Sequence, residues 1–135
     1  MADIDGEDVE LDPTALARAE AALNALSGRY LTWARADLVR LAASLEQALA
    51  DDGKSHLNEL FSIAHDMKGQ AATFGYPLIS HLGNHLCRLI EAVRAGQQPS
   101  LTPATALVAA MDQILSEQLE GEGGETGRRL MATFP

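Results

Sequence analysis

The residues of this chain best suited to carry chemistry are a histidine and a lysine three positions apart, His65 and Lys68. Side chains at positions i and i+3 of an α-helix lie on neighbouring parts of one face, so the ammonium can lean toward the imidazole. Histidine is the side chain whose unperturbed pKa lies closest to neutrality, and its neutral ring can act as a nucleophile near pH 7. The pair therefore predicts a nucleophilic imidazole with a cation beside it.

The stretch around this pair has the pattern of an amphipathic helix. At 3.6 residues per turn, its apolar side chains share one stripe that would face a core. They are Leu57, Leu60, Phe61, Ala64, Met67 and Ala71. His65 falls on the flank of this stripe, beside Ser62, Gly69 and Ala72. A glycine in mid-helix costs about 1 kcal/mol relative to alanine, so Gly69 indicates that something approaches closely there.

The sequence around this pair resembles a known family. The pattern His65-x-x-Lys68-Gly69, followed by Gly75 and by the leucine-rich stretch Leu78 to Val93, is similar to the signature of histidine-containing phosphotransfer (HPt) domains. The resemblance implies that His65 is the phosphorylated residue. It also implies that the ammonium of Lys68 offsets the negative charge that phosphorylation adds.

The same resemblance implies a partner and a reaction. The partner would be the receiver domain of a response regulator, whose aspartate exchanges the phosphoryl group with His65; a hybrid histidine kinase is a second expected partner. Docking would use Ser62, Gly69, Ala72 and Gly75. Any Mg²⁺ would belong to the receiver, because no carboxylate cluster stands beside His65 to hold it, and this chain is expected to need no cofactor. The chain is therefore expected to be a phosphoryl carrier without its own kinase domain, and not an enzyme.

Composition limits the other function classes. With 135 residues and 47% apolar content, the chain is expected to form one domain with a single core. A formal charge of −9 argues against binding to nucleic acid or to anionic membrane surfaces. No apolar run approaches the ~20 residues of a membrane span, and the acidic N-terminus is unlike a signal peptide. The single cysteine, Cys87, is consistent with a reducing compartment, so a cytoplasmic protein is expected.

The chain divides into three regions by composition. Residues 1–11 are acidic and lack periodicity, which predicts a flexible arm. Residues 12–120 carry the helical patterns and are predicted to form the HPt-like bundle. Residues 121–135 are rich in glycine and glutamate and predict a flexible C-terminal tail, although Leu130, Met131 and Phe134 could dock weakly.

Five helices are predicted within the bundle region. They are Pro13 to Leu26, ended by Ser27-Gly28; about 29 to 50; the histidine helix ending at Gly75; Leu78 to Val93; and a last helix opened by Thr102-Pro103. Four long helices with short connections favour an all-α fold. The predicted architecture is an up-down-up-down antiparallel four-helix bundle, with an additional N-terminal helix capping one end. We expect a monomer.

Two features raise alternatives. His81 and His85 are spaced i,i+4 on one helix, which suits zinc, but no third ligand stands at an obvious spacing, and two solvated histidines are favoured. Some HPt domains orient the imidazole with an amide from the following helix, and the roughly matching position here is Cys87, a poor hydrogen-bond partner. The ring is then oriented by water or backbone, or is mobile before a partner binds. Cys87 itself is favoured as a packing residue over a nucleophile.

Two further classes share the helical pattern. The dimerisation hairpin of a sensor histidine kinase also places an acidic residue after its histidine, as Asp66 does here. Such hairpins usually carry a proline five residues after the histidine, where this chain has Gln70. A non-catalytic interaction module would keep the bundle and use the small-residue face only for docking. The presence of both His65 and Lys68 favours phosphotransfer over this alternative.

Overall fold

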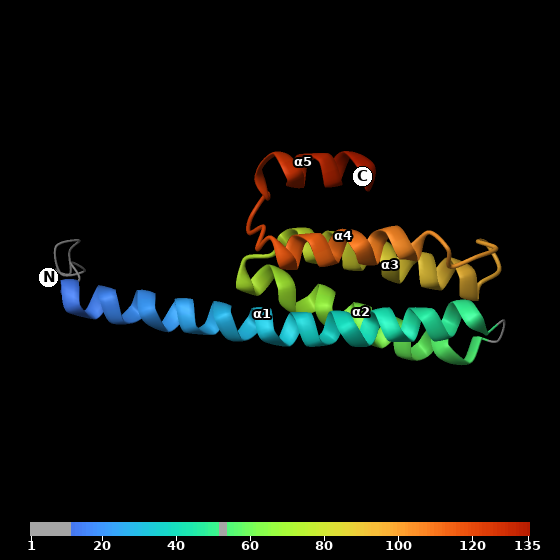
Figure 1. The fold of residues 1–135 in the computed structure, drawn as a ribbon, viewed down its shortest axis with the longest axis horizontal. Helices are drawn as coiled ribbons and strands as arrows, with labels where there is room; N and C mark the ends of the chain where they lie inside the picture. Colours follow the sequence, from blue (N-terminus) through green and yellow to red (C-terminus); the bar gives the residue numbers. More distant parts are fainter. Residues whose placement is uncertain (1–11, 52–53) are drawn as a thin grey trace, which may run out of the picture.

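The computed structural model describes residues 12–51 and 54–135, and within them the fold is all-helical, as predicted (Figure 1). Five α-helices and two short 3-10 helices follow one another in these residues, with no strand. Their bounds are α1 Pro13–Ala50, η2 Lys54–His56, α2 Leu57–Ala71, η3 Ala72–Phe74, α3 Pro77–Arg94, α4 Ala104–Ser116 and α5 Gly124–Thr133. None of the described helices is long and apolar enough to cross a membrane.

Helix α1 is one continuous helix of 38 residues, so the prediction of a break at Ser27-Gly28 is wrong. Gly28 keeps a helical backbone and is not among the glycines with positive φ. One glycine costs a helix only about 1 kcal/mol, and the residues around it are mostly strong helix formers. The described residues 12–51 therefore form no separate capping helix. The N-terminal half of α1 instead projects beyond the rest of the molecule (Figure 1).

One hydrophobic core joins α1, α2, α3 and α4. Helices α1 and α3 each pack against both α2 and α4, and α2 packs most extensively against α3. The largest fully buried side chains are Tyr30, Leu41, Leu60, Tyr76, Ile79, Leu82, Leu86, Ile90, Met111, Ile114 and Leu115. These contacts are those of a helical bundle, and the up-down-up-down order of its helices stays a prediction.

The turn between α2 and α3 fixes the end of the bundle that follows the histidine helix. Gly75 adopts the left-handed conformation with φ 91°, as its predicted role in closing the helix requires, although α2 itself ends four residues earlier and continues as η3. The ring of Tyr30 on α1 stacks on Phe74 and Tyr76, at centroid distances of 5.0 and 5.4 Å. These rings hold the turn against α1.

The C-terminal segment is not the tail that the sequence predicts, because residues Gly124–Thr133 form helix α5. The backbone N–H of Gly121 donates to the carbonyl of Gly75 at 2.9 Å, and His81 Nε2 lies 2.6 Å from the carbonyl oxygen of Phe134. Leu130 and Phe134 pack against the core. The high content of glycine and glutamate made this short amphipathic helix hard to predict, because tertiary contacts stabilise it. The predicted arm, residues 1–11, lies outside the described residues.

Candidate functional site

His65 lies in the middle of α2 with its side chain exposed, off the buried stripe. Its imidazole stacks on the ring of Phe61, one turn earlier, with a centroid distance of 5.7 Å and an interplanar angle of 22°. Phe61 was predicted to face the core, but it is only partly buried and lies at the edge of the core. Within the described part of the chain, no hydrogen bond or ion pair to the His65 ring is found. Ring stacking is therefore the contact that orients this imidazole.

Lys68 is partly buried at the seam between α2 and α3. Its Nζ donates a hydrogen bond to Oδ1 of Asn84 on α3 at 3.1 Å. The ammonium thus stands one turn beyond His65 and is tethered to the neighbouring helix. The acceptor is a neutral amide, so the positive charge of Lys68 is not cancelled by its partner.

Asn84 is a site residue that the sequence analysis missed. Cys87, the position expected to match the orienting amide of related domains, is buried, and burial raises the pKa of its thiol while Lys68 partly lowers it. Cys87 is therefore a packing residue, as favoured above.

A sequence feature that could have indicated Asn84 is the pair Ser80 and Asn84. These two polar residues are spaced i,i+4 and lie on one face of a leucine-rich helix. Ser80 Oγ indeed donates to the carbonyl of Lys68 at 2.7 Å.

Gly83 is a second residue that the sequence analysis missed. It is buried in α3 directly against the histidine helix. A Cβ at this position would lie 3.0 Å from Cβ of Lys68, 3.3 Å from its Cα and 3.4 Å from the carbonyl oxygen of Ala64. Two of these neighbours are backbone atoms that cannot rotate away. The missing side chain therefore sets how closely α2 and α3 approach beside His65.

Three of the four predicted docking residues gather around the histidine. Ser62, Gly69 and Ala72 are all exposed, and on a helix they lie within about 60° of His65 around the axis. A Cβ added to Gly69 would meet nothing within 4 Å, so this part of the face is open. The histidine and these three neighbours form an exposed strip of small side chains, which we call the open strip.

Gly75, the fourth predicted docking residue, has a different position. It is partly buried at the turn, its carbonyl is bonded to Gly121, and a Cβ on it would lie 3.6 Å from a carboxylate oxygen of Glu120. Its positive φ is the reason for glycine at this place. The structure therefore gives Gly75 a backbone function that stands apart from the open strip.

A second cation lies on the other side of the histidine. Arg94, at the end of α3, donates from Nη2 to Oδ1 of Asn58 at 2.9 Å. Its guanidinium carbon lies 5.6 Å from the centroid of the Phe61 ring. Phe61 is thus held between Arg94 and His65, which restricts the ring on which the imidazole stacks.

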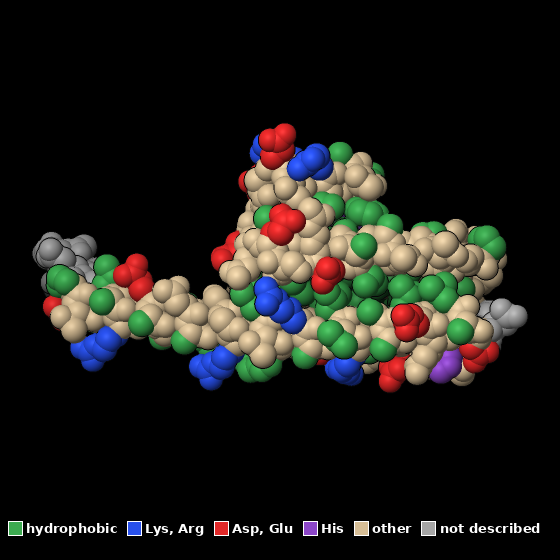
Figure 2. Space-filling view, in the orientation of Figure 1, with side chains coloured by type: hydrophobic (Ala, Val, Ile, Leu, Met, Phe, Trp, Pro, Cys, Tyr) green, Lys and Arg blue, Asp and Glu red, His purple; other side chains and the backbone are tan. Residues whose placement is uncertain are grey.

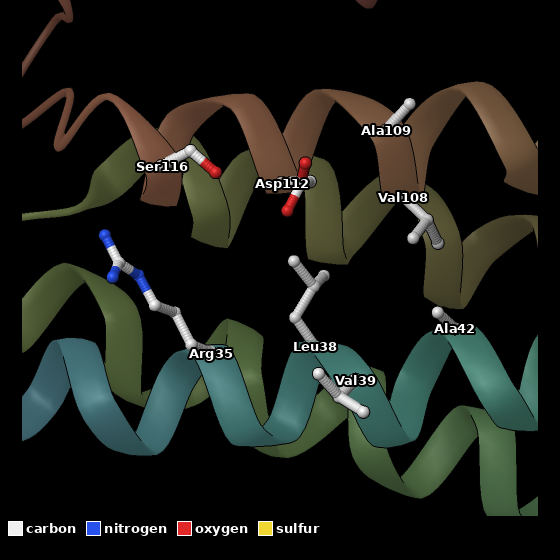
Figure 3. Close-up of a pocket in the computed structure, with 8 residues that line it drawn as sticks. All are labelled: Arg35, Leu38, Val39, Ala42, Val108, Ala109, Asp112 and Ser116. Atoms are coloured by element: carbon white, nitrogen blue, oxygen red, sulfur yellow. The ribbon is translucent and has the colours of Figure 1, made fainter.

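One groove of the molecule lies away from this strip. It has a volume of about 580 Å³ and runs between α1 and α4, and Arg35, Leu38, Val108 and Asp112 are among the residues that line it (Figure 3). Figure 2 shows hydrophobic side chains gathered along the line between these two helices. None of the residues around His65 lines that groove. Small-molecule sites are concave and enclose most of their ligand, so an exposed histidine outside this groove is better suited to a macromolecular partner.

The histidine pair of α3 gives no support to the metal alternative. The rings of His81 and His85 meet edge to face at a centroid distance of 4.8 Å, and His81 is engaged with the C-terminal segment. Among the residues that the structure describes, no group of three or more His, Cys, Asp and Glu side chains could hold a metal ion.

A helical bundle that presents one exposed histidine beside a tethered lysine defines a class of module, and comparison with known families identifies it. The family model of the Hpt domain matches residues 29–120, so the chain belongs to the Hpt domain family. It is a histidine phosphotransfer module of two-component signalling.

Among curated proteins, the chain is similar to the chemotaxis protein CheA of Salmonella typhimurium. The two are 31% identical over 85 residues, which cover 59% of this chain and 13% of CheA. The chain therefore corresponds to a small part of that protein. No solved structure matches the chain.

Alanine substitution at Gly83 and at Gly69 is expected to have opposite effects on stability. Gly83→Ala is expected to lower the free energy of unfolding by about 1–3 kcal/mol, because the new Cβ forces α2 and α3 apart. Gly69→Ala is expected to raise it by up to about 1 kcal/mol, because the position is open and alanine is the better helix former. Denaturant unfolding of the three proteins checks both. Equal stabilities would show that the helix contact at Gly83 is looser than described.

Proposed function

We propose that His65 carries a phosphoryl group between the aspartate of a response-regulator receiver domain and a second such domain or a hybrid histidine kinase. The observation that supports this proposal best is the exposed imidazole of His65 on an open strip of small residues, in a chain of the Hpt family. In the forward step a neutral ring nitrogen attacks the phosphorus of the aspartyl phosphate. The bond between phosphorus and the carboxylate oxygen breaks, and the aspartate leaves as a carboxylate. The reverse step returns the group.

The open strip accounts for how a receiver would reach the ring. The attacking nitrogen, the phosphorus and the leaving oxygen must come nearly into line, so the receiver backbone has to lie close to α2. Ser62, Gly69 and Ala72 leave room for this approach. The ring keeps its orientation through Phe61, and no hydrogen bond from the described part of the chain would have to be broken first.

Lys68 would supply the positive charge that meets the phosphoryl group. Its tether to Asn84 keeps the ammonium within one turn of His65 and leaves its charge uncompensated. Phosphorylation adds a charge of about −1.5 to −2 on Ser, Thr or Tyr at pH 7, and a phosphorylated imidazole gains negative charge in the same way. An ammonium that can turn from an amide oxygen to a phosphoryl oxygen stabilises this product.

The rest of the reaction would be supplied by the partner. We expect the receiver to hold the Mg²⁺ that neutralises the transferring group, and a separate kinase to introduce the phosphoryl group from ATP. The chain then acts as a carrier and not as an enzyme, on an antiparallel four-helix bundle. The direct test is incubation with phosphorylated receiver domains, followed by acid and base treatment of the labelled chain. An acid-labile, base-stable label supports phosphohistidine, and absence of label across a panel of receivers favours a docking-only module.

His65→Ala is expected to abolish labelling while the circular dichroism spectrum and the melting temperature stay near those of the wild type. The side chain is exposed and outside the core, so its loss leaves no cavity. His85→Ala is the matched control and should label normally. Residual labelling of the His65→Ala protein at His56, His81 or His85 would contradict the assignment.

The charge of Lys68 can be tested in two ways. Lys68→Ala should slow transfer a few-fold, since an exposed ion pair is worth about 0.2–1 kcal/mol. Asn84→Asp should also slow it, because a carboxylate at this position would pair with the ammonium and cancel its charge without changing side-chain size. Asn84→Ala, which removes the tether and adds no charge, is the control. Single-turnover transfer rates measure all three, and wild-type rates for both Lys68→Ala and Asn84→Asp would remove Lys68 from the mechanism.

Gly69→Leu tests whether the strip is the docking surface. The position is open, so the leucine should leave the fold intact, yet its side chain would stand beside His65 and nearly stop transfer. Thermal melting and transfer are measured on the same protein, with Gly69→Ala as the smaller substitution. A folded Gly69→Leu protein that transfers at the normal rate would place the partner elsewhere.

A further inference from the structure

The N-terminal part of α1, residues 13–29, has no described neighbour. In Figure 1 it projects from the body of the molecule with no other helix beside it. All of its residues are exposed except Ser27, which is half-buried. The family match covers residues 29–120, so all of this segment except its last residue lies outside the matched region. We refer to residues 13–29 as the α1 extension.

The α1 extension carries an apolar seam with the spacing of a coiled coil. Leu16, Ala19, Leu23 and Leu26 are separated by three, four and three residues, which is the a/d alternation of heptads. The exposed fractions of the three leucines are 45%, 63% and 40%. Large apolar side chains in one continuous row are a mark of an interaction surface, whereas single exposed ones are ordinary.

The seam continues the buried face of α1. At 100° per residue, its four residues lie within about 40° of Tyr30 around the helix axis, and so do Leu41 and Ala48 in the core. From Tyr30 onward this face is covered by the other helices of the bundle. Before Tyr30 the same face is bare. The core face of α1 thus extends beyond the body that covers it.

From these observations we infer that the α1 extension is a dimerisation element, and that its occupant is the α1 extension of a second copy, running antiparallel. We therefore propose a dimer in place of the monomer expected from the sequence. In the antiparallel pair Leu16 lies opposite Leu26 of the other copy, and Ala19 opposite Leu23. When residues 13–29 of the two copies overlap fully, the seam of each α1 extension is covered by the other. The overlap ends where the helical bundle of each copy begins.

Two properties favour an antiparallel second copy as the occupant. A parallel pair would bring both bodies to one side, because each body sits on the seam face; the antiparallel pair puts them at opposite ends. The extension contains only Arg18, Glu20 and Arg29 as charged residues, in a chain of net charge −9, so two copies meet where their mutual repulsion is least.

The expected dimer is weak. The extension is about 25 Å long and a helix about 10 Å wide, which gives each copy a contact strip on the order of 250 Å². The total lies below the range of stable complexes and is typical of transient association. A helix of this length without packing is itself marginal, so pairing would also increase its helicity. We expect a monomer–dimer equilibrium in the micromolar range.

Sedimentation equilibrium of the full chain, from about 5 to about 500 µM, tests the proposal. The wild type should pass from mostly monomer to mostly dimer. Leu23→Glu should stay monomeric throughout, and Val39→Glu should dimerise like the wild type. Val39 is the matched control because it is 70% exposed and lies on the opposite face of α1. A wild type that stays monomeric, or an equal loss of dimer in both variants, would overturn the proposal. If the wild type is monomeric and Leu23→Glu alone slows phosphotransfer from a receiver, the seam is a receiver-binding surface and not a dimer contact.

Disulfide cross-linking tests the orientation. A mixture of Ala19→Cys and Leu23→Cys proteins in oxidised glutathione should form the mixed disulfide faster than either protein links to itself. The native Cys87 is buried and does not compete. Faster self-linking of both variants would show parallel helices and overturn the antiparallel pairing.

Discussion

The close contact of α2 with α3 at Gly83 is the constraint on which the rest of the site depends. It places the backbone of α3 within reach of Lys68, so that Asn84, the next residue along α3, can accept a hydrogen bond from the ammonium. It also allows Ser80 to bond the Lys68 carbonyl and to accept from the N–H of Ala72. A larger residue at 83 would widen the seam and loosen all of these contacts together, because packed helices move as rigid bodies.

This packing allows His65 to be exposed in the middle of α2. The core face of α2 and the seam with α3 hold the helix from two sides, and His65 lies outside both, so its side chain is accessible. Its orientation comes from Phe61, an apolar residue at the edge of the core that is itself restrained by Arg94. A stacked imidazole keeps both ring nitrogens free of protein hydrogen bonds within the described residues, which suits the group-accepting and group-releasing role that we propose for His65.

Local pattern and motif predicted the histidine helix, the position of His65 on its flank and the all-α class, because these depend on residues close in sequence. What they missed depends on contacts between segments. Gly83 reads as an ordinary helix glycine until α3 is placed against α2. The same ambiguity made Gly28 look like a helix end, since glycine ends a helix only where a left-handed conformation is adopted. Helix α5 was missed for a third reason: its short pattern is stabilised by contacts with α3 and with Gly75, which composition cannot show.

The acceptor that holds Lys68 determines how much of its charge remains in the site. The ammonium donates to the amide oxygen of Asn84, although the chain contains 19 Asp and Glu residues. A carboxylate would hold the ammonium more strongly but would cancel its field, since opposite charges at about 3 Å nearly neutralise each other at a distance. An amide fixes the position of the cation and leaves its charge in place. In an acidic protein this arrangement keeps positive potential beside His65, where we propose that negative charge arrives. It costs little stability, because the amide hydrogen bond replaces an ion pair that is weak at a surface.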